Sequence, residues 1–423
     1  MDKRCLIVSY YFAPLGGGGV QRILKLIKYL SRDDWNFSVV TAGDQLESVP
    51  SDYSLLQEIP GEVEIIRVLN NLPVIEKQVL KNLPFLKDAS YWKRWLSAFY
   101  YIPDMRKDWI APAKNAILTE INQKKYDCIL ITAPPYSLAI LAAELTQEVS
   151  LPVILDMRDP WTMNPYKIHP TPFHFKMDYK YELDSISRVK YGVAAYKSLV
   201  DNYQNTIPGF DAANWETIPN GFDEEDFDSL SPVNLDDGYF NLAFSGTFYS
   251  HINNPENLFK AIALVEKKYP EKIRKIQFHH IGKSMISLKT LAKKYGIESN
   301  IKEWGYQEHK NCLELLSGMD ACCFILDDKY SKSDMTIGGK VYEYLRLRKP
   351  ILALVPETGE AADLIVKTNS GRVIPPSRIS EIARVLAEWT KLIPEFTFNG
   401  IEKYSRKNLT DNFRHFLERI IHE

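Results

Sequence analysis

Short apolar runs alternate with amphipathic segments along most of this chain. Residues 4–9 form a mostly apolar run, which is typical of a strand buried on both faces of a sheet. Apolar residues then recur at helical spacing between residues 20 and 30, and residues 37–41 predict a second strand. The amino-terminal pattern therefore predicts a strand, a loop, a helix and a strand in succession.

The same alternation continues through most of the chain and is interrupted by a turn-rich, acidic segment at residues 208–238. Alternating strands and helices predict parallel sheets that are covered by helices on both faces. Further strands are predicted at residues 63–66, 127–132, 152–156, 192–195, 240–245, 276–281, 301–304, 321–326 and 351–355, and helices at 137–147, 174–188, 254–269, 309–319 and 340–348.

Two successive alternating halves predict an α/β chain made of two Rossmann-like domains that face each other across a ligand cleft. We place the amino-terminal domain at residues 1–214 and the carboxy-terminal domain at residues 215–401. We expect a last helix, residues 402–423, to pack back on the first domain.

Composition narrows the class of protein. A chain of 423 residues is long enough for two or three domains, and 52 basic against 54 acidic side chains give a net charge of -2. This balance argues against a general nucleic-acid binder. Five cysteines without metal-ligand spacing fit a reducing compartment. Because no long apolar stretch occurs, we expect a cytoplasmic protein with no membrane span.

The loop after the first strand contains four consecutive glycines, Gly16 to Gly19. Glycines let the backbone turn sharply and approach an anion, and the following helix offers free amides at its positive end. We therefore expect Gly17, Gly18 and Gly19 to contact a phosphate or a sugar hydroxyl. The alternative is a tight turn with no ligand.

A charged sequence, residues 156–159, follows the strand predicted at residues 152–156, so it lies at a strand's carboxyl end. Arg158 could stabilise a leaving phosphate, and Asp159 could accept a hydrogen bond from a sugar hydroxyl. The alternative, at even odds, is a structural ion pair between Arg158 and the neighbouring carboxylates.

Two glycines, Gly338 and Gly339, open the helix predicted at residues 340–348. Lys340 supplies a cation in its first turn, and Glu343 lies on the same helix face. A cation beside phosphate and a carboxylate beside ribose hydroxyls is what a nucleoside diphosphate requires. The alternative is an ordinary pair of oppositely charged residues on a helix. Gly246 follows another strand, where a glycine would let backbone amides reach a phosphate.

The order of these motifs resembles glycosyltransferase family 4, whose members have the GT-B fold. The likeness covers nearly the whole chain and is strongest between Ile218 and Pro376. It implies a retaining transferase that uses a nucleotide-activated sugar, UDP- or GDP-linked, without a cofactor or catalytic metal. The first domain would bind the acceptor and the second the donor. The motifs are the glycine loop and residues 218–223, 244–247, 340–345 and 369–376.

The resemblance also implies roles for single residues. Glu343 would hold the donor ribose, Gly246, Gly338 and Gly339 would approach the diphosphate, and Gly305-Tyr306 would read the base. Gly18 and Gly19 would approach the donor phosphate or the acceptor, while Arg158 and Asp159 would lie close to the transferred sugar.

The sequence departs from the family pattern at three positions. Met335 stands where the family has the first glutamate of its Glu-x7-Glu motif, although Asp334 is adjacent. Thr247 and Asn253 stand where the family commonly has Arg and Lys. The missing positive charge could come from Lys340 or Lys283.

Residues 77–107 combine seven basic side chains with interleaved aromatic ones, in contrast to the acidic chain as a whole. Such a surface suits an anionic membrane, so the segment could dock a lipid-linked acceptor at the inner face of the membrane. The alternative, at even odds, is an amphipathic helix with its aromatics in the core. Single-stranded nucleic acid would use similar chemistry, but the family resemblance disfavours it.

The leading prediction is therefore a transferase acting on a glycan or lipid-linked acceptor in cell-surface polysaccharide synthesis. A GT-B epimerase is the rival enzyme, with His251, His279 and His280 as available acid–base groups. A protein that binds a nucleotide sugar without turning it over is the alternative from another class, because the first motif glutamate is missing.

Overall fold

The computed structural model describes residues 3–43, 52–69, 89–235, 238–249, 253–268, 274–328 and 333–423, with the side chains of residues 89–93 left aside. The chain divides into two compact units. Unit 1 comprises Met1–Pro219 and Arg406–Glu423, and unit 2 comprises Asn220–Ser405. The boundary thus lies between Pro219 and Asn220 rather than after residue 214. The cleft predicted between the two domains stays a prediction.

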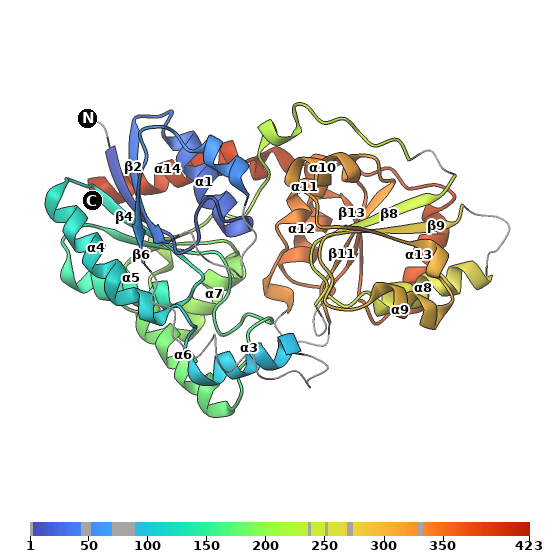
Figure 1. Cartoon of the computed structure of the whole chain (residues 1–423), viewed down its shortest axis with the longest axis horizontal. Coiled ribbons are helices and arrows are strands. Elements are labelled where there is room, and N and C mark those ends of the chain that lie inside the picture. Colours follow the sequence, from blue (N-terminus) through green and yellow to red (C-terminus); the bar gives the residue numbers. More distant parts are fainter. Residues whose placement is uncertain are drawn as a thin grey trace. The chain divides into compact units, whose positions relative to one another are not determined.

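Unit 1 is built on a parallel seven-stranded sheet (Figure 1) with the order β3-β2-β1-β4-β5-β6-β7. The direction of chain progression reverses between β1 and β4, and in open α/β sheets ligands bind outside the carboxyl ends at such a point. The strands are β1 Lys3–Val8, β2 Trp35–Ala42, β3 Glu64–Val68, β4 Cys128–Ala133, β5 Val153–Met157, β6 Tyr191–Ala194 and β7 Trp215–Thr217.

Helices cover this sheet. In Figure 1 the carboxy-terminal helix α14 lies beside α1, and apolar side chains of α14 such as Phe413 and Leu417 join the core beneath α1. The helices of unit 1 are α1 Gly18–Leu30, α3 Ala89–Tyr100, α4 Ile110–Gln123, α5 Ser137–Glu148, α6 Pro172–Ile186, α7 Lys197–Thr206 and α14 Arg406–His422, with 3-10 turns at Tyr53–Glu58, Lys107–Trp109 and Ala212–Asn214.

Unit 2 repeats the design with a parallel six-stranded sheet in the order β10-β9-β8-β11-β12-β13. Its switch point lies between β8 and β11. The strands are β8 Phe240–Ser245, β9 Ile276–Ile281, β10 Ile301–Gly305, β11 Ala321–Ile325, β12 Ile351–Leu354 and β13 Gly371–Ile374. The helices are α8 Glu256–Lys268, α9 Leu288–Tyr295, α10 His309–Ser317, α11 Lys340–Arg346, α12 Glu360–Thr368 and α13 Ile379–Trp389, with 3-10 turns at Glu224–Phe227, Glu298–Asn300, Ser333–Met335 and Ile401–Tyr404.

The central strands show why the sequence pattern predicts them. Every residue of β4 and β8 is buried, because helices cover both faces, so apolar residues stand at consecutive positions in these strands instead of alternating with polar ones. Strand β7 was missed because its three residues lie in the segment read as turn-rich. Its Trp215 packs on Gly192 of β6, where an added Cβ would lie 2.5 Å from the indole.

Two further predictions concern cysteines and the membrane. All five cysteines are free and buried. Within the described part of the chain, no helix combines the length and the apolar character that crossing a membrane requires.

Candidate functional site

The glycine loop of unit 1 lies directly against the Arg158 side chain. Gly17, which precedes α1, has a φ of 122° that side chains rarely adopt, and no side chain caps the helix. A Cβ added to Gly19 would lie 1.3 Å from Nη1 of Arg158. The structure therefore brings together two predicted site elements that are far apart in the sequence. It also explains why position 19 is a glycine, since a side chain there would collide with Arg158.

Backbone carbonyls hold Arg158 in place. Its Nε donates to the carbonyl of Ala133 at 3.3 Å, and its Nη2 donates to the carbonyl of Pro134. Burial lowers the pKa of Arg158 and raises the pKa of Asp159, although Arg158 opposes the second shift. Among the described residues Arg158 forms no ion pair with Asp156 or Asp159, so the structural ion pair considered for Arg158 is not formed.

Asp156 instead forms an ion pair with a residue that the sequence analysis did not identify. Arg22 of α1 reaches it with a distance of 2.9 Å between Nη2 and Oδ1, and both side chains are almost completely buried. Thr132 donates to the other carboxylate oxygen at 2.8 Å. Arg22 also donates to the carbonyls of Ile218 and Pro219, each at 2.9 Å. Asp156 thus ties β5 to α1 and to the segment that leaves unit 1.

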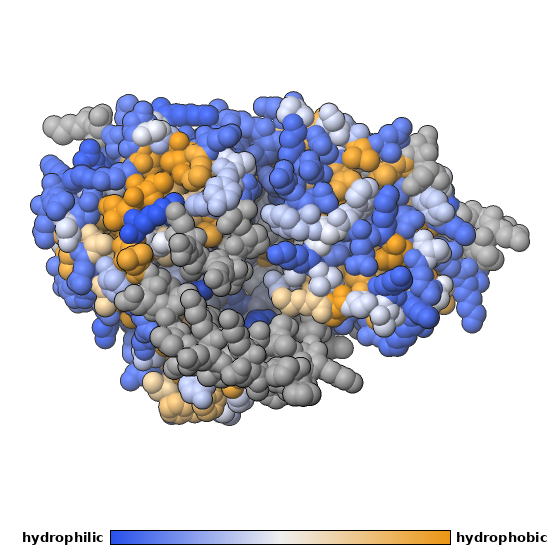
Figure 2. Space-filling view, in the orientation of Figure 1, coloured by the Kyte–Doolittle hydropathy of each residue, from blue (hydrophilic) through white to orange (hydrophobic). Residues whose placement is uncertain are grey.

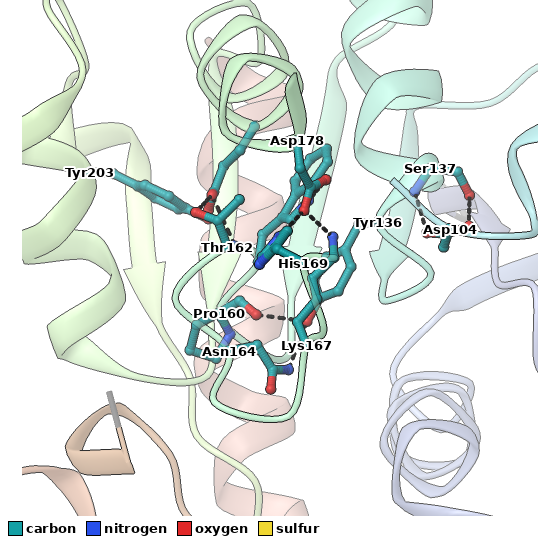
Figure 3. A network of polar contacts seen from close by, with 12 residues as sticks. Asp104, Tyr136, Ser137, Pro160, Thr162, Asn164, Lys167, His169, Asp178 and Tyr203 are labelled. Atoms are coloured by element: carbon teal, nitrogen blue, oxygen red, sulfur yellow. Dashed lines mark hydrogen bonds and ion pairs between the residues drawn. The ribbon is translucent and has the colours of Figure 1, made fainter. Parts of the chain in front are cut away.

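A buried polar network supports the loop after Arg158 and Asp159 (Figure 3). Asp178 of α6 accepts a hydrogen bond from the Trp161 indole at 2.8 Å, and lies 2.7 Å from His169 and 2.6 Å from Lys167. Burial raises the pKa of Asp178, but these partners outweigh it and lower the pKa overall. The loop is therefore fixed by charge pairing as well as by packing.

A second set of contacts continues this support. Glu182, one turn after Asp178, accepts hydrogen bonds from the backbone and hydroxyl of Thr162 at 3.0 and 2.5 Å and from Tyr203 at 3.1 Å. Tyr136 donates to the carbonyl of Pro160 at 2.6 Å, as Figure 3 shows. The segment that follows Asp159 is thus bonded to α6 and to the loop after β4, and Tyr203 of α7 holds Glu182 in turn, which makes the segment a rigid platform.

The contact between Gly19 and Arg158 gives a direct prediction. Changing Gly19 to Ala should destabilise unit 1 by about 1 kcal/mol, because the new Cβ displaces the end of the Arg158 side chain from its two carbonyls. Thermal unfolding measures the effect. Gly18→Ala is the matched control, since its Cβ would meet nothing within 4 Å. Equal melting temperatures for the two variants would show that the contacts of Arg158 with the two carbonyls do not contribute to stability.

In unit 2, three neighbouring strands each end in a glycine. Gly246, Gly282 and Gly305 follow or close β8, β9 and β10, with φ values of 149°, 142° and 69°. The Gly246 amide donates to Ile281 at 2.9 Å, and the Gly282 amide donates to Gly305 at 2.8 Å. A Cβ on Gly282 would lie 2.1 Å from the Gly246 carbonyl oxygen. These glycines allow close backbone packing at the carboxyl edge.

Two other predicted donor residues lie on the same edge. The Phe248 amide donates to the Lys283 carbonyl at 3.1 Å, which places Thr247 beside the Lys283 loop. The Lys283 ammonium lies 5.7 Å from the ring centroid of Tyr306, which is 56% exposed. Thr247, Lys283 and Tyr306 therefore form one neighbourhood with an open aromatic face.

Helix α11 carries a compact charge cluster. The Lys340 ammonium lies 3.0 Å from both carboxylate oxygens of Glu343, and Nε2 of His309 lies 3.1 Å from Oε1. Burial raises the pKa of Glu343, but Lys340 and His309 outweigh it and hold the pKa at about 2. The stabilisation is therefore present at neutral pH and is lost only as the pH falls through this low value.

The pKa of the His309 imidazole is shifted upward, opposite to that of Glu343. Burial lowers its pKa, but Glu343 and Asp226 outweigh burial and raise the pKa overall. This stabilisation is present below the ordinary histidine pKa and is lost as the pH rises through the raised value.

Contacts at both ends of α11 fix it to the sheet. The Ser245 amide donates to the hydroxyl of Tyr344 at 2.8 Å, which ties the helix to the end of β8 beside Gly246. A Cβ on Gly338 would lie 2.9 Å from the Phe324 ring, whereas one on Gly339 would meet nothing within 4 Å. Close packing against Phe324 thus explains why position 338 is a glycine, whereas Gly339 faces open space.

The departures from the family pattern have structural explanations. Met335 is buried in the turn Ser333–Met335. The Cβ of Asp334 lies 2.5 Å from where a Cβ of Gly359 would be, so Asp334 lies against the start of α12. Asn253 has a φ of 45° and donates to the Thr247 carbonyl at 2.8 Å, so it shapes the loop after β8.

The histidines considered as acid–base groups are engaged elsewhere. His279 lies 2.8 Å from Asn241 through Nε2, and its Nδ1 accepts from the Trp304 indole at 3.1 Å. His280 contacts the Gly246 carbonyl at 3.0 Å. His251 lies outside the described residues. Among the described residues, no cluster of three or more His, Cys, Asp or Glu could hold a metal ion.

The basic and aromatic segment 77–107 is only partly an outward surface. Arg94 donates to the Tyr166 carbonyl at 2.6 Å, and Trp109, which follows the segment, is fully buried. Lys107 lies 3.2 Å from the Tyr181 hydroxyl, and Arg106 is buried over the Tyr10 ring. The prediction of a basic outward surface is therefore wrong for Arg106, which belongs to the core, as does Trp109. Lys77, Lys81, Lys87 and Asp88 lie outside the described residues, as do the side chains of Tyr91, Trp92 and Lys93.

Sequence reasoning missed Arg22, His309 and Tyr344. A weak signal existed for Arg22, which is a charged residue within the apolar helix pattern of residues 20–30. His309 and Tyr344 had none, because their partners lie on other elements and no spacing connects them.

We compared the chain with family profiles, curated proteins and solved structures. The profile of the family described as "Glycosyl transferases group 1" matches residues 227–395. No curated protein gives a significant match to the chain.

Solved structures resemble the whole chain at low sequence identity. WaaG, a glycosyltransferase involved in lipopolysaccharide biosynthesis, is 12% identical, with a TM-score of 0.61 over 98% of this chain and 95% of that one. The trehalose-6-phosphate protein from E. coli, bound with UDP-2-fluoro glucose, is 15% identical, with a TM-score of 0.65 and 99% of each chain covered.

A variant of S. aureus TarM, in complex with Fondaparinux, alpha-GlcNAc-glycerol and UDP, is 11% identical, with a TM-score of 0.63 over 98% of this chain and 99% of that one. At these identities the likeness shows the fold alone. The chain therefore has the two-unit α/β fold of these GT-B structures, and its residues 227–395 match the glycosyl transferases group 1 model.

Proposed function

We propose that this protein transfers a sugar, with retention of configuration, from a UDP- or GDP-sugar to a glycan or lipid-linked acceptor, as part of cell-surface polysaccharide synthesis. The observation that carries the proposal is the cluster of Lys340, Glu343 and His309 beside the glycine-rich carboxyl edge of unit 2. This edge lies within the segment that matches the group 1 family, and WaaG and TarM, which share the fold, support the acceptor class.

The donor is proposed to lie on the carboxyl edge of unit 2. Glu343 would accept hydrogen bonds from the ribose hydroxyls, because its carboxylate stays ionised at any physiological pH. Lys340 and the backbone at Gly339 would stabilise the diphosphate as negative charge develops on the leaving group. The exposed ring of Tyr306 would stack on the base, with Lys283 nearby.

The carboxyl edge of unit 1 is proposed to hold the transferred sugar and the acceptor. Gly17 and Gly18 are exposed and would let a sugar hydroxyl approach the start of α1. Arg158 is fixed by carbonyls rather than by a carboxylate, so its charge remains available to a phosphate. Asp159, whose pKa is raised by burial, would accept a hydrogen bond from a hydroxyl of the transferred sugar. A front-side retaining path needs no strong protein base.

The first test is thermal unfolding of the purified protein with UDP, GDP, CMP, ADP and their common sugar conjugates. A ligand at 100 times its dissociation constant stabilises the folded state by about 2.7 kcal/mol. We expect a selective upward shift with uridine or guanosine diphosphates. No shift with any of these ligands would contradict the donor site in unit 2.

Product analysis separates the proposed transferase from its alternatives. A labelled nucleotide sugar that passes its sugar to an acceptor supports transfer. Epimerised donor formed without any acceptor would identify an epimerase, although the engagement of His279 and His280 in the sheet argues against this. Binding without turnover would identify a non-catalytic protein.

A membrane contact is proposed for the junction of α3 and α6. Phe173 and Tyr100 are 64% and 65% exposed there, and Nε2 of His174 lies 3.0 Å from the Phe99 carbonyl, which joins the two helices. Figure 2 shows apolar residues at the lower end of α6. An apolar tip on the helix whose Tyr181 contacts the exposed Lys107 suits an anionic bilayer.

Vesicle co-sedimentation tests this contact. The double variant Tyr100→Ser and Phe173→Ser should bind vesicles containing anionic lipid several-fold more weakly than the unchanged chain, because two apolar anchors are lost. Tyr53→Ser, which removes a 70% exposed aromatic elsewhere in unit 1, is the matched control. Binding that is insensitive to anionic lipid, or equal in all three proteins, would contradict the proposed surface.

A further inference from the structure

His309 lies between two carboxylates that come from different elements. Its Nε2 lies 3.1 Å from Oε1 of Glu343 on α11, and its Nδ1 lies 3.8 Å from Oδ2 of Asp226 in the turn Glu224–Phe227. The side chain of His309 is 29% exposed and that of Glu343 is 14% exposed. The imidazole is therefore a partly buried bridge between the two acids.

The position of His309 in its helix is unfavourable for a cation. It is the first residue of α10, where the positive end of the helix dipole opposes a positive charge. The two facing carboxylates offset this effect, and the pKa of His309 is raised. Protonation at this position is thus favoured by the cluster and not by the helix that carries it.

The other charged groups around His309 belong to two elements. Lys340 and Glu343 face it from α11, and Asp226 faces it from the turn before β8. Within that turn Glu224 is paired with Arg346. On α10 itself, burial raises the pKa of the Cys312 thiol, which therefore stays neutral near pH 7. Protonation of His309 is the change that alters the charge of this cluster between about pH 5 and pH 8.

The charge balance links His309 to Lys340. Without a proton on His309, Lys340 is the cation that neutralises Glu343, and it contacts both carboxylate oxygens at 3.0 Å. An anionic ligand must then compete with Glu343 for the lysine. With His309 protonated, Glu343 keeps a cationic partner when Lys340 turns away, so the lysine can contact the anion at a lower electrostatic cost.

We propose that His309 is a positioning residue that holds Glu343 and releases Lys340 to the diphosphate of a nucleotide sugar, so that donor binding tightens when the imidazole is protonated. This inference rests on the proposed donor site and adds the partner that makes its lysine available. His309 acts through Glu343 and Lys340 and touches no reacting atom.

The test is a calorimetric titration with sugar conjugates of UDP, GDP and ADP at pH values from about 5.5 to 8.5. These diphosphate diesters carry a fixed charge in this range, so their own titration does not contribute. We expect the unchanged protein to bind its donor about fivefold more tightly at the acid end, as one added charge at a partly exposed site would produce. His309→Gln should bind weakly with a flat pH profile.

Two more variants separate positioning from a structural role. His309→Lys carries a permanent cation and should bind tightly with a flat profile, whereas a purely structural histidine would lose binding in both variants. His415→Gln removes an exposed histidine of unit 1 and should keep the original profile. Asp226→Asn, which leaves His309 in place, should move the pH midpoint downward, and it remains informative if His309→Gln folds poorly.

The outcomes distinguish the two proposals. If no nucleotide sugar binds the unchanged protein at any pH, both the proposed donor site and this inference fail. If a donor binds and its pH profile is the same in His309→Gln, the donor site stands and the role of His309 is wrong. A flat, tight profile for His309→Lys beside a flat, weak one for His309→Gln supports the inference.

Discussion

Replacing Arg22 with Met is expected to destabilise unit 1 by about 3–5 kcal/mol, because it removes one partner of a buried ion pair. Asp156 is completely buried and would keep the Thr132 hydroxyl as its remaining hydrogen-bond donor among the contacts described. The carbonyls of Ile218 and Pro219 would also lose the guanidinium that binds them. Chemical denaturation followed by fluorescence measures the loss.

Two comparisons make this prediction specific. Lys197→Met removes an exposed cation that pairs with Asp201, and surface pairs of this kind contribute about 0–1 kcal/mol. The double variant Arg22→Met with Asp156→Asn should recover part of the lost stability, since no charge is then buried without a partner. An Arg22→Met protein as stable as Lys197→Met would show that the buried pair is not what joins α1 to β5.

The fold was predictable because its signals are local. β8 and β9 begin and end at the predicted residues. Both faces of each strand are covered, and the buried polar residues Asn241 and His279 hydrogen-bond to each other. Helix α11 ends at Arg346, earlier than predicted, and the positive φ of 52° at Arg348 shows that the chain has left the helix before Pro350. The unit boundary differs because Arg22 holds Ile218 and Pro219 in unit 1, a contact that no local pattern reveals.

The site was predictable only in part, for the same reason. Glycine loops and strand ends appear in the sequence, so Gly19, Gly246 and Lys340 could be proposed from it. What each side chain contacts depends on packing between elements. The sequence suggested that Arg158 pairs with a neighbouring carboxylate, yet Asp156 pairs with Arg22 and Arg158 lies against Gly19. The contact between His309 and Glu343 joins two helices and could not be read from spacing.

Glu343→Ala is expected to weaken binding of the nucleoside diphosphate by about 10- to 100-fold, which is the effect of losing hydrogen bonds to a charged group. The carboxylate is held in place by Lys340 and His309, so it is already oriented before a ligand arrives. Because its pKa is about 2, Glu343 stays ionised between about pH 5 and pH 9. Calorimetric titration with UDP and GDP measures the loss, with Glu298→Ala, an exposed acid before β10, as the control.

Inorganic pyrophosphate separates the ribose contact from simple electrostatics. Removing Glu343 leaves Lys340 and His309 without the acid that neutralises them, so the site becomes more positive and should bind pyrophosphate more tightly than the unchanged protein. A ribose contact predicts the opposite change for the nucleotide. Weaker nucleotide binding together with tighter pyrophosphate binding would therefore assign Glu343 to the ribose. If both ligands bind more tightly, the acid acts only on the charge of the site, and if neither changes, the donor does not lie at α11.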